Sequence, residues 1–264
     1  MELIKSYSNQ NAVKVIAFAI SLEKELSSIE IRELIDNLKE NQIFKNDFND
    51  NQLQQMLSMV ISQDNIPKQE NSIGGIIFQK NDENKKNLWS LIVNKDSLIV
   101  TCKVYTRWNE VSIKALEYIS IVFDYLKNLY ISQITLEYLD EFEILEKLEK
   151  WKEVLFQDSC KYITPNIYEL NDFWHISQGY FIKLKNIEER ILDTVDINYF
   201  SDELDNLKHK VNMRMQHKLR YETPVEYTKD DINRYFNEMH IHSKELFFKI
   251  VHNDILNEFH TGEV

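Results

Sequence analysis

Short apolar runs recur along the chain and predict a protein rich in β-strands. The first run, AVKVIAFAI at residues 12–20, is dominated by β-branched and aromatic side chains, which favour an extended backbone. The same pattern predicts strands at residues 73–79, 88–93, 98–105, 131–142, 175–184, 190–200 and 210–221. Residues 53–63 fit either a helix or a strand, because a run this short matches both hydrophobic periods.

Helices are predicted where apolar residues recur every three to four positions. Ser27 and Glu30 form the signature of a capping box at the start of one such helix. The apolar stripe that follows consists of Ile31, Leu34, Ile35 and Leu38. A long and unusually apolar helix is expected at residues 109–130, a short one at residues 146–156, and a last long helix at residues 228–251.

The apolar faces of the two long helices identify the expected hydrophobic core. In and just before the earlier helix, the core residues are Trp108, Tyr118, Val122 and Leu126. In the last helix they are Phe236, Met239, Phe247 and Ile250. These side chains are expected to bury against a sheet, because an amphipathic helix needs a partner surface for its apolar stripe.

The order of the predicted elements indicates an α+β fold. Each half of the chain contains a run of strands that is followed by a long helix. The expected architecture is therefore a broad, mainly antiparallel curved sheet built from two similar strand and helix halves, with long helices packed on one face. The halves are residues 1–130 and 131–264, and they are expected to form one compact unit.

Composition and charge exclude several classes of protein. The chain has 264 residues, of which 43% are hydrophobic and 28% charged, as in ordinary globular proteins. Four glycines and three prolines are too few for a collagen-like chain or a flexible linker. The net charge of −12 opposes wholesale binding to nucleic acid or anionic membranes, although it permits a local basic patch.

The beginning of the sequence and the cysteines indicate a cytoplasmic protein without a membrane partner. No basic segment followed by a long apolar stretch opens the chain, so no signal peptide is expected. The early apolar segment at residues 13–20 is too short to span a bilayer. Cys102 and Cys160 form no CxxC pair and no disulfide framework, which is typical of reduced, buried thiols.

Motifs for catalysis and cofactor binding are absent from the sequence. It contains no GxxxxGK[ST], GxGxxG, GxSxG or HExxH pattern. His240 and His242 are two residues apart in the last predicted helix, so they point to roughly opposite sides of it. His242 could share an ion with Glu245, but packed histidines without a metal are the favoured interpretation. The sequence therefore predicts no catalytic residue, no cofactor and no metal site.

Carboxylates raise one further question about chemistry. Asp193 lies in line with the apolar face of its predicted strand, where a carboxylate needs a partner. A cross-strand Arg or Lys, or a position at the sheet edge, is favoured over a catalytic role. The two acidic clusters at the ends of predicted strands are expected to be solvated; they are Asp140, Glu141 and Glu143, and Asp202, Glu203 and Asp205.

The clearest candidate for a binding surface is a basic strand. In KVNMRMQHKLRY, residues 210–221, alternation places Lys210, Arg214 and Lys218 on one face and His217 on the apolar face. The basic stripe could receive phosphates or an acidic partner. The alternative is that Glu188 and Asp196 on the neighbouring strand neutralise it.

Four stretches together resemble a family of sporadically distributed, uncharacterised bacterial proteins of about this length. They are residues 87–105 followed by Trp108, ITLEYL at 134–139, FQDSCKYITPNIY at 156–168 and FNEMHIHSKELF at 236–247. The resemblance implies a strand pair, a helix that begins after a Trp and a terminal helix with an LH…F pattern. It carries over no catalytic residue. The patchy occurrence of such accessory genes implies a role in defence, toxin–antitoxin pairs or immunity.

Three functions follow, in order of preference. The first is a non-enzymatic regulatory protein, such as an antitoxin, immunity protein or phage-defence component, that binds a toxin or another defence subunit. Self-association into a homo-oligomer is compatible with this role. The second is a protein that binds or senses nucleic acid through the basic strand face. The third is an enzyme whose site combines distant residues, such as Asp193 and the late histidines.

Overall fold

A computed structural model describes residues 4–8, 10–61, 67–126, 129–145, 150–158, 160–170, 173–202, 208–226 and 228–259. The strands are β1 (Ile4–Ser6), β2 (Val13–Leu22), β3 (Asp50–Ile61), β4 (Pro67–Asn81), β5 (Asn87–Asn94), β6 (Ser97–Cys102), β7 (Tyr130–Ile144), β8 (Trp174–Lys183), β9 (Arg190–Asp202) and β10 (Lys208–Glu226). The helices are α1 (Ser28–Glu40), α2 (Gln42–Asp47), α3 (Trp108–Asp124), α4 (Trp151–Leu155), the 3₁₀ turn η1 (Pro165–Glu169), α5 (Lys229–Ile250) and α6 (Asn253–Glu258).

The α+β class and the antiparallel sheet are confirmed. Each predicted strand corresponds to one observed strand, and the ambiguous segment at residues 53–63 belongs to strand β3 as far as Ile61. The remaining strand, β1, is only three residues long and pairs antiparallel with β7. Every strand pair whose register is resolved runs antiparallel. None of the helices in the described part is long and apolar enough to cross a membrane.

Two compact units interleave along the chain. The first comprises residues 1–16, 135–220 and 233–264, and the second comprises residues 17–134 and 221–232. Strands β2, β7 and β10 therefore contribute residues to both units. The boundaries do not follow the two consecutive halves expected from the order of elements, because neighbouring strands in space come from distant parts of the chain.

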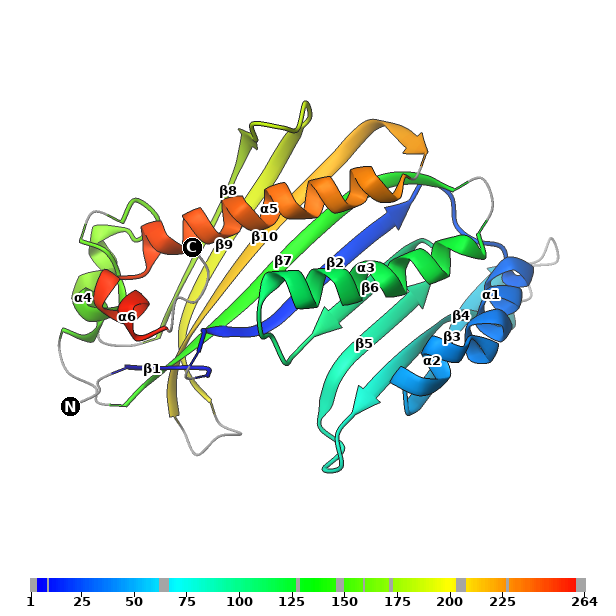
Figure 1. Ribbon diagram of the computed structural model, residues 1–264, viewed down its shortest axis with the longest axis horizontal. Coiled ribbons are helices and arrows are strands. Elements are labelled where there is room, and N and C mark those ends of the chain that lie inside the picture. The colour runs from blue at the N-terminus through cyan, green and yellow to red at the C-terminus, as the bar shows by residue number, and fades with distance from the viewer. Residues whose placement is uncertain are drawn as a thin grey trace. The chain divides into compact units, whose positions relative to one another are not determined.

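The second unit combines helices α1 to α3 with strands in the order β3-β4-β5-β6-β2 (Figure 1). Phe44 from α2 packs edge-on against Phe78 of β4 and Tyr118 of α3. Trp108, at the start of α3, stacks on Phe18 of β2. Edge-on and offset aromatic pairs of this kind add to the stabilisation from burial itself.

The first unit contains the order β7-β10-β9-β8, with α5 lying along these strands (Figure 1). Strands β9 and β10 alternate between buried and more exposed residues. In β9 the odd-numbered residues from Ile191 to Tyr199 are buried, and the same holds in β10 from Val211 to Tyr221. The buried face packs against α5, whose Phe236, Met239 and Ile250 are fully buried.

Most of the predicted core is confirmed, and the exceptions have local causes. Trp108, Tyr118 and Val122 are buried as expected, as are the three α5 residues named above. Leu126 is only half-buried, because α3 ends at Asp124 rather than at residue 130. The amides of Tyr125 and Leu126 bond to carbonyls three residues back, which tightens and closes the last turn. Phe247 is also half-buried, although its ring stacks on Phe142.

Candidate metal centre

Two neighbouring strands of the first unit place polar side chains opposite each other on their buried faces. Asp193 of β9 and His217 of β10 are direct cross-strand partners in the antiparallel register. Both side chains have no solvent exposure. Their neighbours on the same face are apolar, with Ile191 and Val195 flanking the aspartate and Met215 and Leu219 flanking the histidine. The alternation of each strand thus carries one polar residue into an otherwise apolar layer.

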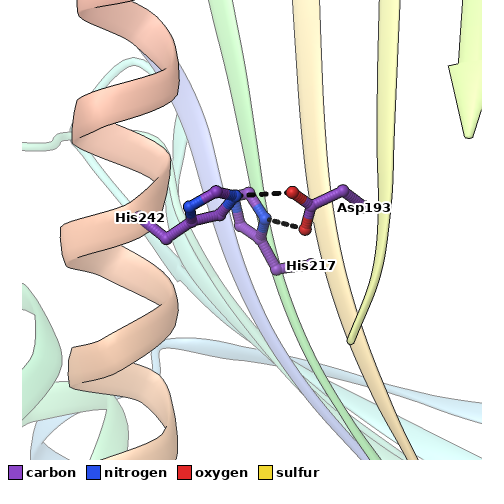
Figure 2. Close-up of side chains that lie close together, drawn as sticks. All are labelled: Asp193, His217 and His242. Carbon is purple, nitrogen blue, oxygen red and sulfur yellow. Dashed lines mark hydrogen bonds and ion pairs between the residues drawn. The ribbon is translucent and has the colours of Figure 1, made fainter. Parts of the chain in front are cut away.

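Helix α5 completes the cluster with His242. Figure 2 shows both imidazoles on one side of the Asp193 carboxylate, with one carboxylate oxygen directed to each. Oδ1 lies 2.9 Å from Nδ1 of His217, and Oδ2 lies 2.5 Å from Nε2 of His242. The imidazole rings meet edge to face with centroids 5.2 Å apart. Three elements that are distant in sequence therefore converge on one carboxylate.

The electrostatics of the cluster favour an ionised aspartate. Burial alone would raise the pKa of Asp193, but the hydrogen bonds from His217 and His242 bring it below its ordinary value. Burial lowers the pKa of His217, although Asp193 acts in the opposite direction. An ionised carboxylate only accepts hydrogen bonds, so both imidazoles donate an N–H to it. With His217 neutral, its ring supplies a dipole to the carboxylate and no positive charge.

His217 also has an unused nitrogen. Its Nε2 atom is buried and has no hydrogen-bond partner among the described residues. Buried polar atoms without partners are rare in native proteins, because each one loses its bonds to water without replacement. The cluster is therefore not fully satisfied by its internal hydrogen bonds.

A tyrosine pair borders the cluster on the other side of β9. Tyr180 of β8 is the cross-strand partner of Asp193, and its hydroxyl donates to the hydroxyl of Tyr162 at 3.2 Å. Burial, the hydrogen bond to Tyr162 and the charge of Asp193 all raise the pKa of Tyr180. Tyr180 therefore keeps its proton, which it donates to Tyr162.

The three residues form a set of ligands that suits a divalent transition metal. Each can offer one ligand atom, and these atoms all lie within 4.8 Å of one another. Imidazole nitrogens and a carboxylate oxygen bind such ions at about 2.0–2.2 Å, which puts adjacent ligand atoms about 3 Å apart. The nitrogen–oxygen distances of 2.5 and 2.9 Å are already close to this spacing.

The sequence pointed to part of this cluster. It singled out Asp193 as a buried carboxylate in need of a partner, but it favoured a Lys or Arg, whereas the partners are histidines. Strand alternation places His217 on the apolar face but does not identify it as that partner. The signal was available, since one polar residue interrupts the apolar face of each of two adjacent strands.

The two histidines of α5 point in different directions, as their spacing predicted. His240 Nδ1 lies 2.7 Å from the hydroxyl of Tyr138 on β7, whereas His242 contacts Asp193. Burial lowers the pKa of His240 to about 4, which keeps this ring neutral. Glu245, the alternative companion of His242, is exposed.

The predicted basic face is largely matched by acids of β7. Arg214 Nη2 lies 2.7 Å from Glu137, and Lys210 is buried with its Nζ atom 3.5 Å from Glu141. Asp196 lies opposite Arg214 in the register, as expected, but the ion pair is formed with Glu137. Lys218 is half-buried opposite Leu192.

The expectation of solvated acidic strand ends is wrong for Asp140 and Glu141. β7 continues to Ile144, so both residues lie inside the strand, and they are only 2% and 6% exposed. Glu141 pairs with Lys14 at 2.6 Å in addition to its pair with Lys210. Glu203 and Asp205 lie outside the described residues, as do residues 146–149 of the expected short helix.

No model of a known protein family matches the chain, and none of the curated proteins matches it. The resemblance to sporadically distributed bacterial proteins therefore stays a prediction. The role in defence, immunity or toxin control that it implies stays a prediction as well.

Proposed function

We propose that the protein binds a divalent transition-metal ion through Asp193, His217 and His242, and that this ion is its functional centre. The observation that carries the proposal is a fully buried carboxylate that contacts one imidazole with each oxygen. Two histidines and one carboxylate are a recurrent ligand set for zinc and for non-haem iron.

Charge balance supports an ion at this position. The ionised Asp193 carries a negative charge in an apolar layer, and a buried charge needs compensation. Neutral His217 does not supply it. A divalent cation would, and it would bind Nδ1 of His217, the nitrogen that faces the carboxylate.

The number of ligands indicates what kind of centre this would be. Structural zinc sites use four protein ligands, whereas catalytic sites use three and keep a position for water or substrate. The side chain of His242 is 17% exposed, whereas the other two ligands are fully buried. The arrangement therefore favours an ion that acts on a bound water or substrate.

The test is metal binding by protein that has been stripped with a chelator. We expect calorimetric titration with Zn²⁺ to give one tight site per chain, and Co²⁺ to give the visible absorption of a low-symmetry complex. His242→Ala should weaken binding by a factor of more than about ten, because one of three ligands is lost. His242 is chosen because it is the only ligand that is not fully buried.

The control is His252→Ala, which removes a partly exposed histidine at the start of α6, outside the cluster. This variant should bind Zn²⁺ like the unmodified chain, and circular dichroism should confirm that both variants fold. Absence of a stoichiometric site, or equal affinity in both variants, contradicts the proposal. The cluster would then be a buried hydrogen-bonded network that ties α5 to the sheet.

A further inference from the structure

The sheet face of the first unit that points away from α5 carries four cations near one end of its strands. Lys183 of β8 and Arg190 of β9 are cross-strand partners, and Arg220 of β10 continues the β9–β10 register by one position, opposite Arg190. These three exposed side chains lie side by side on adjacent strands, which are about 4.8 Å apart. Strand alternation puts them on the side opposite the buried residues that face α5. Lys218 adds a fourth cation two residues before Arg220 on the same face.

An exposed aromatic ring lies next to these cations. Phe181 of β8 is 67% exposed and lies directly opposite Leu192 of β9. Leu192 in turn lies opposite Lys218, so a phenyl ring, a half-buried leucine and a lysine form the row beside the first three cations. We call the ring and the four cations the Phe181 patch; its members are Phe181, Lys183, Arg190, Lys218 and Arg220.

Acids do not match the cations of the Phe181 patch, in contrast to the cations in the first half of β10. Lys208, Lys210 and Arg214 each pair with a glutamate of β7. Among the described residues, no acid forms an ion pair with any of the four patch cations. Glu188, one of the two acids that could have neutralised the basic stripe, is exposed and forms no such pair. The patch is therefore a local excess of positive charge on a chain whose net charge is −12.

We propose that the Phe181 patch binds single-stranded nucleic acid. Cations without acidic partners attract phosphates, and an arginine guanidinium can donate two hydrogen bonds to one phosphate. An exposed aromatic ring beside them can stack on a base, and such stacking is effective for every base. An acidic protein segment would use the four cations but would leave the ring without a role. The acidic remainder of the chain should restrict binding to this patch.

The experiment is titration with a fluorescently labelled oligothymidylate of about ten nucleotides, followed by anisotropy at several salt concentrations. We expect saturable binding that weakens with salt, with a slope of log affinity against log salt of up to about −2.8 if all four cations contact phosphates. Arg190→Gln combined with Arg220→Gln should halve this slope, because two of the four contacts are lost. Lys24→Gln combined with Arg32→Gln is the matched control, since it removes two exposed cations of the second unit. The control should bind like the unmodified chain.

Phe181→Ala tests the stacking separately from the charge. It should weaken binding at least about fivefold and leave the salt slope unchanged, because it removes a stacked base but no cation. Phe248→Ala, which removes an exposed ring of α5, is its control, and circular dichroism should confirm that every variant folds. Equal binding by Phe181→Ala and the unmodified chain, or displacement by polyglutamate as effective as by the unlabelled strand, would indicate an acidic protein partner and overturn the proposal. Absence of saturable binding at low salt would overturn it as well. All titrations contain a chelator, so their result is independent of the metal centre.

Discussion

Two buried aspartates in the first unit show how neighbours decide the charge of a residue. Asp193 and Asp140 are 0% and 2% exposed, respectively. Two imidazoles donate to Asp193, and its pKa lies below the ordinary value. The Oδ2 atom of Asp140 has no hydrogen-bond partner among the described residues, and burial raises the pKa of this group to about 8. Asp140 is therefore mainly protonated at neutral pH, while Asp193 is ionised.

The raised pKa of Asp140 predicts a pH-dependent stability. In the unfolded chain this pKa returns to about 4, so between about pH 4 and pH 8 the folded state holds a proton that unfolding releases. The contribution of Asp140 to the free energy of unfolding is thus fully present at low pH, and it is lost as pH rises towards 8. The slope is at most about 1.4 kcal/mol per pH unit.

Asp140→Asn should remove this dependence, because the amide is neutral at every pH and close in shape. We expect the free energy of unfolding of the variant to rise, relative to that of the unmodified protein, as the pH increases from 5 to 8. Urea unfolding at each pH measures this difference. Asp124→Asn, at the exposed end of α3, is the control for the loss of a carboxylate. A stability difference that stays constant over this pH range would contradict the assigned pKa.

At the scale of single elements, local signals account for both ends of α1. The capping box predicted from the sequence is present: the Ser27 hydroxyl accepts from the amide of Glu30 at 3.2 Å, and the Glu30 carboxylate accepts from the amide of Ser27 at 2.8 Å. These contacts satisfy amides that the first turn of a helix leaves free. The same hydrogen bonds lower the pKa of Glu30. At the other end, the amide of Asn41 bonds to the carbonyls of Asn37 and Leu38, and the Asn41 side chain accepts from the amides that open α2.

Ser27→Ala should lower the free energy of unfolding by about 1 kcal/mol, because the cap is lost while the apolar face of α1 is unchanged. Ser28→Ala is the matched control. Ser28 is the next residue and equally exposed, but it belongs to the first turn and is not the cap. Chemical unfolding of both variants gives the comparison. Equal stability of the two variants would show that the capping box contributes nothing measurable.

For the whole molecule, the metal centre would link parts of the first unit that are distant in sequence. His217 and His242 lie 24 and 49 residues from Asp193, respectively. An ion that binds all three stabilises the folded state by mass action, by about 2.7 kcal/mol at a hundred times the dissociation constant. Because all three ligands belong to the first unit, this stabilisation should be concentrated there.

Hydrogen exchange can measure this distribution. We expect Zn²⁺ to slow amide exchange in β9, β10 and α5 and to leave α1 and α3 of the second unit unchanged. His242→Ala should abolish the effect. The expectation rests on the proposed metal centre. Equal slowing in both units, or slowing that persists in the variant, would show that the ion acts elsewhere on the chain.

Sequence patterns predict the strands, the capping box of α1 and the position of Asp193 on an apolar strand face. Each of these features depends on residues that are close along the chain. Alternation in β9 and β10 decides which side chains are buried, whatever the neighbouring strands are. Strand order and the position of α5 decide which buried side chains meet. Strand order and the position of α5 bring His217 and His242 to Asp193. The placement of β7 beside β10 gives Arg214 and Lys210 their acidic partners. Long-range packing of this kind has no local periodicity, and so no pattern in the sequence reports it.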